Sequence, residues 1–195
     1  NLPQHIQERL ADEAYMLSQA EHPNVPRYIT YQVVKKQGIL MMQRAKGIDL
    51  EQFSLKHGRL PVRLLIDIAS QLADVLLALR QHQKDGELLP IVHGDIKPSN
   101  LVYDDESGMV SLIDWGSSVF AQLDSNGQYL ANNVMQLMSA DLQNSNARMG
   151  DVYFIGPEQR NGALSSPRFD EQGVAGTLYA LASGQSCRFG CKAIP

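Results

Sequence analysis

The sequence contains little cysteine, and the two cysteines that it has stand close together near the C-terminus. Of 195 residues, only Cys187 and Cys191 are cysteines. A zinc site would need further ligands, and neither His nor Cys follows this pair, while a disulfide framework would need more pairs. We therefore expect ordinary thiols in a reducing compartment, and the sequence predicts a cytoplasmic protein.

Long apolar runs and an excess of basic charge are also missing. No apolar run approaches the roughly 18 residues that a membrane-spanning helix requires, so no membrane segment is predicted. The 17 Lys and Arg face 21 Asp and Glu, a net charge of −4, which argues against a nucleic-acid partner. The remaining composition, with 44% apolar and 19% charged residues, is typical of one soluble globular domain.

Apolar periodicity indicates separate groups of helices and strands. The predicted helices span residues 4–21, 50–56, 61–83 and 170–183, and the predicted strands span residues 27–34, 39–42, 101–103 and 110–113. We expect Gly38 to mark the turn between the first two strands and Asp49 to cap the second helix. Residues 120–150 are rich in Gln, Asn and Ser and predict a long loop. Because helices and strands do not alternate, the predicted fold class is α+β.

Two short polar motifs carry the chemical information of the chain. The first is His-Gly-Asp-Ile-Lys-Pro-Ser-Asn at residues 93–100, and the second is Asp-Trp-Gly at residues 114–116. Together they resemble the catalytic loop and the metal-binding motif of the protein kinase family. The resemblance covers most of the chain and implies a protein kinase-like fold. It places a partial N-lobe (helix C plus two strands) at residues 1–44 and a mainly helical C-lobe at residues 45–195.

The resemblance also implies a role for each polar residue of the two motifs. Asp95 would take the proton of the acceptor hydroxyl, and Lys97 would offset the charge of the phosphoryl group in transfer. Asn100 and Asp114 would hold Mg²⁺ through hard oxygen ligands. The implied reaction is the transfer of a phosphoryl group from ATP to a Ser or Thr hydroxyl of a protein substrate.

Other positions fall into register with the same family. By resemblance, Glu13 is the helix glutamate that pairs with a strand lysine, and Asp170 is the residue that hydrogen-bonds the catalytic-loop backbone. The implied nucleotide-binding positions are the gatekeeper Met42, the backbone of Gln43 and Ala45 for adenine, Asp49 for the ribose, and Val102 and Leu50 against the ring. Gly156-Pro157-Glu158 resembles the end of an activation segment.

The chain also departs from the family pattern. The 195 residues contain neither the glycine-rich loop nor the lysine that Glu13 should meet, and we expect both upstream. Gly94 replaces an arginine that normally meets a loop phosphate, so loop phosphorylation should not be the main switch. From Asp114 to Glu158 is 158 − 114 = 44 positions, a long segment that suggests a regulatory partner. Asp151 stands where a threonine is usual, which weakens the assignment of the acceptor.

Three functions remain open at this point. A serine/threonine protein kinase agrees with Lys97 and the Gly-Pro-Glu motif. A kinase of small molecules agrees with His-Gly-Asp but not with Lys97. A non-enzymatic binding module of the pseudokinase type would agree with the missing phosphate loop, and the upstream reading frame would separate it from the first.

Overall fold

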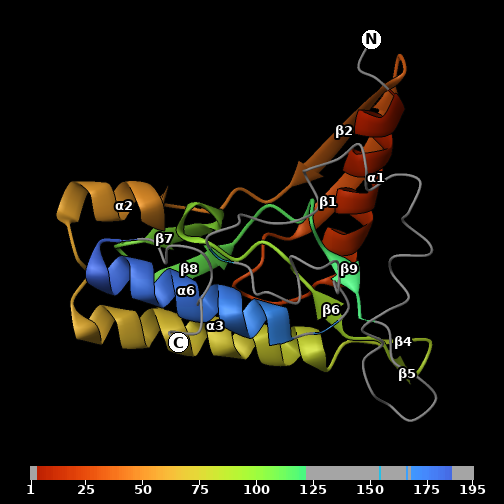
Figure 1. The fold of residues 1–195 in the computed structure, drawn as a ribbon. Helices are drawn as coiled ribbons and strands as arrows, with labels where there is room; N and C mark the ends of the chain where they lie inside the picture. The colour runs from red at the N-terminus through yellow and green to blue at the C-terminus, as the bar shows by residue number, and fades with distance from the viewer. Residues whose placement is uncertain (1–3, 122–153, 155–165, 167, 186–195) are drawn as a thin grey trace, which may run out of the picture.

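Two groups of elements make up the computed structural model, which describes residues 4–121, 154, 166 and 168–185. The smaller group stands at the upper right of Figure 1 and contains α1 (Gln4–Gln19), β1 (Tyr28–Val34) and β2 (Gln37–Met42). The larger group contains α2 (Leu50–His57), α3 (Val62–Arg80), α6 (Arg168–Ser183), the 3₁₀ turn η1 (Pro98–Asn100), β3 (Ile48–Asp49), β7 (Leu101–Asp104) and β8 (Met109–Leu112). Short strands β6 (Ile91–Val92) and β9 (Val119–Phe120) pair with each other between the groups.

β1 and β2 form an antiparallel hairpin against which α1 packs. Its turn is at Lys35 and Lys36, whose φ values of 49° and 64° suit the tight turn that matches the twist of the strands. The predicted turn at Gly38 is wrong, because Gly38 lies inside β2 opposite Val33. The Tyr31 ring covers Gly38 so closely that a Cβ there would lie 2.6 Å from the Tyr31 hydroxyl.

Helices α3 and α6 lie side by side beneath the β7–β8 hairpin (Figure 1). The apolar stripe of α3 that the sequence predicted is buried, at Ile68, Leu72, Val75 and Leu79. An ion pair between Arg80 and Glu171 joins the two helices at the surface. Most of the buried apolar residues form one continuous core, which extends from Leu17 on α1 to Leu181 on α6.

The end of α3 differs from the prediction. The helix ends at Arg80 rather than near residue 83, and Gln83–Lys84 (β4) pairs with Glu87–Leu88 (β5). Asp85 and Gly86 form the turn of this small hairpin with φ values of 54° and 83°. Asp-Gly is a strong hairpin signal, but the strands are only two residues long, so periodicity did not indicate them.

A close approach of two chain segments builds the β3–β7–β8 sheet. Ile48 and Asp49 pair with Tyr103 and Val102. Gly47, with a φ of 112°, permits this approach, because a Cβ there would lie only 2.0 Å from the Tyr103 carbonyl oxygen. Residues that are 53 positions apart in the sequence are thereby fixed next to each other (102 − 49 = 53).

Most other predicted elements agree with the structure. Asp49 caps α2, since its carboxylate accepts the Gln52 N–H at 2.8 Å, and α6 ends where Gly184 adopts a φ of 73°. No helix within the described part of the chain is long and apolar enough to span a membrane. Both cysteines, Asp151, residues 156–158 and most of the predicted loop at 120–150 lie outside the described residues.

Candidate functional site

A buried carboxylate on α6 holds the start of the loop at residues 93–100. Asp170 is 3% exposed and accepts the backbone N–H of His93 at 2.7 Å and that of Gly94 at 2.9 Å. Burial raises the pKa of Asp170, while the charge of His93 and these backbone donors act in the opposite direction. This contact places Asp170 as the sequence predicted, and it fixes the loop to a helix 77 residues away.

The same face of α6 continues the contact with the loop. Gly173 lies so close that a Cβ there would be 3.0 Å from both the Cβ and the carbonyl oxygen of Ile96. One turn later, the Thr177 hydroxyl donates to the Ile96 carbonyl oxygen at 3.5 Å. Sequence reasoning missed Gly173 and Thr177, although their spacing from Asp170 puts all three on one helix face.

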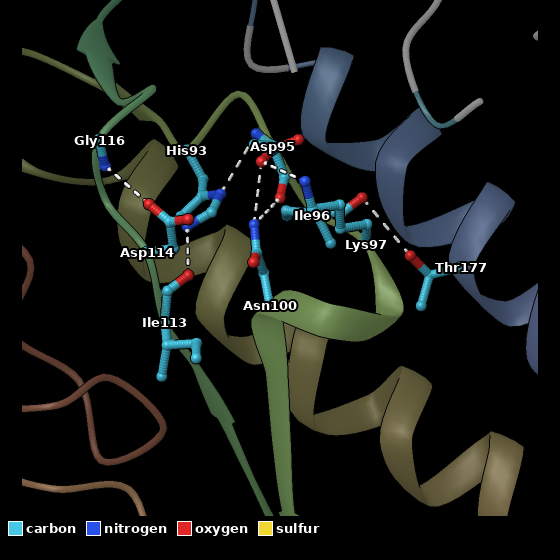
Figure 2. Close-up of polar contacts among 9 residues, drawn as sticks. All are labelled: His93, Asp95, Ile96, Lys97, Asn100, Ile113, Asp114, Gly116 and Thr177. Carbon is cyan, nitrogen blue, oxygen red and sulfur yellow. Dashed lines mark hydrogen bonds and ion pairs between the residues drawn. The ribbon is translucent and has the colours of Figure 1, made fainter. Parts of the chain in front are cut away.

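His93 joins the loop to the strand end that precedes Asp114. Its Nε2 lies 3.2 Å from the Ile113 carbonyl oxygen, and its Nδ1 accepts the Asp95 N–H at 3.3 Å (Figure 2). Only a neutral ring with its proton on Nε2 satisfies both contacts. Burial lowers the pKa of His93, against the raising effect of three nearby carboxylates, and therefore favours the same neutral form.

Asp95, Lys97 and Asn100 form one polar cluster inside the loop (Figure 2). Lys97 Nζ lies 2.9 Å from Asp95 Oδ2. Asn100 Nδ2 donates to the Asp95 carbonyl oxygen at 2.9 Å and to Asp95 Oδ2 at 3.0 Å. The Asp95 carboxylate is therefore held by an ammonium and an amide whose own positions are set by η1.

Asp114 lies beside this cluster on a strained backbone. Its φ of 64° is in the left-handed region, and its Oδ1 accepts the Gly116 N–H at 3.3 Å. Trp115, which is 1% exposed, packs edge-on to the His93 ring with the centroids 4.9 Å apart. Because the rings meet, the two sequence motifs form a single site.

Glu13 on α1 reaches the same turn. A Cβ at Gly116 would lie 3.3 Å from Asp114 Oδ1 and 3.8 Å from Glu13 Oε2, so the two carboxylates flank this glycine. Burial and the negative charge of Asp114 raise the pKa of Glu13, and a hydrogen bond from the Trp115 backbone lowers it. No cation among the described residues contributes to this balance.

The predicted nucleotide-binding residues lie at the end of β2, in the segment after it, and on β3 and β7. Met42 ends β2 and packs against the core, and the Gln43 N–H donates to the Arg27 carbonyl oxygen at 2.8 Å. Ala45 follows in the partly exposed segment before β3. Asp49 on β3 pairs with Val102 on β7, so these two predicted residues are direct neighbours in the sheet.

Asp49 is only partly available for the predicted ribose contact. Its Oδ1 accepts the Gln52 N–H and its Oδ2 accepts Gln52 Nε2 at 2.5 Å. Leu50, which is 0% exposed, belongs to the core. A ligand hydroxyl would therefore share Asp49 with the helix cap.

A steric constraint that the sequence did not reveal explains why position 94 is a glycine. Its φ is 83°, and a Cβ would lie 2.8 Å from the Ser117 carbonyl oxygen. The Ser118 hydroxyl donates to the His93 carbonyl oxygen at 3.2 Å across the same contact. The residues that follow Asp114 therefore pack directly against the loop at Gly94, in the space that the side chain of a larger residue would need.

The oxygen donors of the site fit a small hard cation. Asn100 directs its amide nitrogen to Asp95, which leaves its Oδ1 as an acceptor, and its backbone carbonyl oxygen accepts the N–H of Ile113, the residue before Asp114, at 2.9 Å. Within the described residues, no cluster of three or more His, Cys, Asp or Glu side chains could hold a metal ion. A site with one carboxylate and one amide matches Mg²⁺, which usually keeps waters and substrate phosphates as its other ligands.

Comparison with families places this site in context. The model described as "Protein kinase domain" matches residues 2–189. A serine/threonine-protein kinase of Bacillus subtilis, PrkC, is 25% identical over 91% of the chain, which spans 24% of that relative. The Arabidopsis thaliana serine/threonine-protein kinase ATG1b is 29% identical over 76% of the chain, which spans 21% of it. The chain thus spans about a quarter of the length of these curated relatives.

A solved structure shares the fold. The Cydia pomonella granulovirus kinase PK-1 superposes with a TM-score of 0.66 at 19% identity, over 95% of this chain and 58% of the viral chain. At this identity the likeness concerns the fold, and it agrees with the α+β architecture that the sequence predicted.

Proposed function

The chain belongs to the protein kinase domain family, and on this premise we propose that it transfers a phosphoryl group from ATP to a Ser or Thr hydroxyl of a protein substrate. The Ser/Thr protein kinases among its relatives support the reaction and the acceptor class. We also propose the lobe division of the family, with residues 1–44 in the small lobe and residues 45–195 in the large lobe.

The observation that carries the proposal is the contact of Asp95 with Lys97 and Asn100. Asp95 Oδ2 lies within 3.0 Å of both side chains, so the carboxylate is fixed in the position from which it would act as the base. In the proposed step, the acceptor oxygen bonds to the γ-phosphorus of ATP as the bond to ADP breaks. Asp95 takes the hydroxyl proton, and Lys97 balances the charge of the phosphoryl group.

Asn100 and Asp114 would hold Mg²⁺ in this proposal. When bound, the ion neutralises charge on the ATP phosphates and so favours their transfer. The chain's own contribution is to keep both oxygen donors in place: Asn100 through its two bonds to Asp95, and Asp114 through the Gly116 N–H.

The remaining predicted residues stay proposals for nucleotide binding. Met42, Gln43, Ala45, Asp49 and Val102 would surround the adenine and ribose. Glu13 would pair with a lysine on a strand that these 195 residues do not contain. The exposed aliphatic side chains of the β1–β2 hairpin support further strands there, because Ile29, Val33, Ile39 and Met41 are 45–62% exposed.

The cellular setting and regulation are proposed from the sequence. We propose a cytoplasmic protein whose segment after Asp114 binds a regulatory partner rather than responding mainly to phosphorylation. The close contact between Gly94 and Ser117 supports this view, because it leaves no room for an arginine side chain at position 94 without a backbone shift.

The test compares Asp95→Asn with the same substitution at another aspartate, in the full-length protein. Asp105→Asn removes a carboxylate from the exposed turn between β7 and β8, so it should keep full activity. Asp95→Asn should lower the turnover number by about 10²–10⁴-fold with nearly unchanged ATP affinity. Asp114→Asn should instead remove Mg²⁺-dependent ATP binding.

Other outcomes assign other functions. Full phosphoryl transfer by Asp95→Asn would reject the role of Asp95. Phosphorylated metabolites instead of phosphoproteins, identified by mass spectrometry of a treated lysate, would indicate a small-molecule kinase. ATP binding without transfer by the wild-type protein would indicate a pseudokinase-type module.

A further inference from the structure

Three aromatic rings connect α1 to the chain that follows Asp114. The Tyr15 ring on α1 meets the Phe120 ring on β9 edge-on, with the centroids 6.1 Å apart. The His82 ring stacks with the Phe120 ring at a centroid distance of 6.0 Å. We call Tyr15, Phe120 and His82 the ring cluster. Phe120 is its central member and the only one that contacts both others.

The β4–β5 hairpin, which has no role in the proposed reaction, contacts the ring cluster. Lys84, in β4, donates from Nζ to the Tyr15 hydroxyl at 2.5 Å and lies 5.2 Å from the Tyr15 ring centroid. Lys84 and His82 are two positions apart, so the same short segment contacts Tyr15 through Lys84 and Phe120 through His82. The β4–β5 hairpin, which the sequence did not predict, thereby contacts α1, the helix that carries Glu13.

A pocket that is open to solvent lies next to the ring cluster. It has a volume of about 410 Å³, and residues from the last turn of α1 and from the end of α3 line it, among them Ser18, Glu21, Ala78 and His82. The Nε2 atom of His82 is buried and has no hydrogen-bond partner within the described residues. Leu17 of α1 and Leu79 of α3 are buried in the same core, so the pocket reduces the packing between the two helix ends but does not remove it.

We infer that Phe120 is a positioning residue, which holds α1 through Tyr15 and thereby keeps Glu13 beside Asp114 and Gly116. Tyr15 is two positions from Glu13, and Phe120 is six positions after Asp114. The ring contact therefore joins α1 to the chain after Asp114 close to both carboxylates. The inference rests on the proposed function for its effect on catalysis. Its effect on α1 itself does not depend on that function.

The test uses hydrogen exchange of α1 amides in the full-length protein. Phe120→Leu keeps apolar volume but removes both ring contacts. It should speed exchange at residues 8–19 about threefold to tenfold, because each aromatic pair contributes modestly to local stability. Phe120→Tyr keeps the ring and should restore slow exchange. Tyr15→Phe keeps the ring pair but loses the Lys84 bond, and it should have a smaller effect.

A ring pair on the opposite side of the molecule provides the control. Phe53 on α2 meets Tyr103 edge-on at 5.2 Å, far from α1 in Figure 1. Phe53→Leu should destabilise the protein without selectively exposing α1. If Phe120→Leu leaves α1 exchange unchanged, or changes it only as much as Phe53→Leu does, the inference is wrong.

Activity separates this inference from the proposed function. If the wild-type protein transfers phosphate, Phe120→Leu should raise the KM for ATP more than it lowers kcat, since Glu13 serves nucleotide binding. If the wild-type protein transfers none, the proposed function fails while the exchange measurement still decides the role of Phe120. The double variant Tyr15→Leu with Phe120→Leu should exceed Phe120→Leu alone only by the loss of the Lys84 contacts of Tyr15, because both substitutions remove the same ring pair.

Discussion

The loop at residues 93–100 and helix α1 each contribute an acidic group to the site, but they are held in different ways. The loop is fixed by buried polar contacts: Asp170 is 3% exposed and His93 is 0% exposed. α1 buries Met16 and Leu17 in the core, but its link to the chain after Asp114 is a pair of rings, with Tyr15 44% exposed. Breaking a buried hydrogen bond leaves a polar group unpaired, whereas an aromatic pair contributes only about 0.5–1.5 kcal/mol beyond its buried area. We therefore expect the ring contact between α1 and the chain after Asp114 to break more easily than the anchor of the loop.

The largest expected effect comes from the anchor of the loop. Asp170→Ala leaves the backbone N–H groups of His93 and Gly94 buried without an acceptor, which should lower the free energy of unfolding by about 2–4 kcal/mol. Urea denaturation monitored by circular dichroism measures the loss. The neighbouring Glu171→Ala breaks only the surface pair with Arg80 and should cost less than about 1 kcal/mol. Equal losses in the two variants would show that the loop is not anchored at Asp170.

A second effect concerns the contact between the loop and the residues that follow Asp114. Gly94→Ala adds a Cβ at 2.8 Å from the Ser117 carbonyl oxygen on a backbone with a φ of 83°. The expected destabilisation is about 1–3 kcal/mol, measured by thermal or urea unfolding. Gly108→Ala has a similar φ of 72° but open space around its Cβ, so it should cost only about 1 kcal/mol. If the two variants behave alike, the Ser117 contact adds nothing.

A third prediction concerns pH. Because burial lowers the pKa of His93 from its ordinary value of 6.5, the unfolded chain binds the proton more readily than the folded protein. Stability should therefore fall as the pH drops below about 6.5. Unfolding midpoints between pH 7.5 and 5.5 measure the slope, and His93→Gln should reduce it. His22 and His82, whose pKa values burial also lowers, add to the slope in both proteins. A slope that His93→Gln leaves unchanged would contradict the neutral ring.

The smallest effect belongs to α1. The pKa of Glu13 is raised above its ordinary value of 4.5, so its charged form destabilises the fold once the pH exceeds that range. Glu13→Gln should raise the free energy of unfolding at pH 7 by about 0.5 kcal/mol, a figure reduced for the partial exposure of Glu13. The gain should disappear below about pH 4.5 and should also disappear if an upstream lysine pairs with Glu13. A loss of stability at pH 7 would reveal such a partner.

The sequence was most informative where chemistry and local structure coincide. The residue types at 93–100 and 114–116 predicted one site, and the structure brings Asp95, Lys97 and Asn100 into direct contact. The apolar stripe of α3 predicted a buried helix correctly. Prediction failed at Gly38 and at residues 81–88, because a positive φ at two lysines and strands of two residues leave almost no periodic signal.

By itself, the sequence determined the fold class, the identity of the polar residues and the order of the helices, because these follow from residue type and short-range spacing. Only the tertiary structure decided that Gly173 and Thr177 pack on Ile96, that His93 is neutral, and that Phe120 lies between Tyr15 and His82. Each of these depends on contacts between residues far apart in the chain. Such contacts are set by how the elements pack. The spacing of Gly173 and Thr177 from Asp170 indicates a shared helix face, but it does not say what that face contacts.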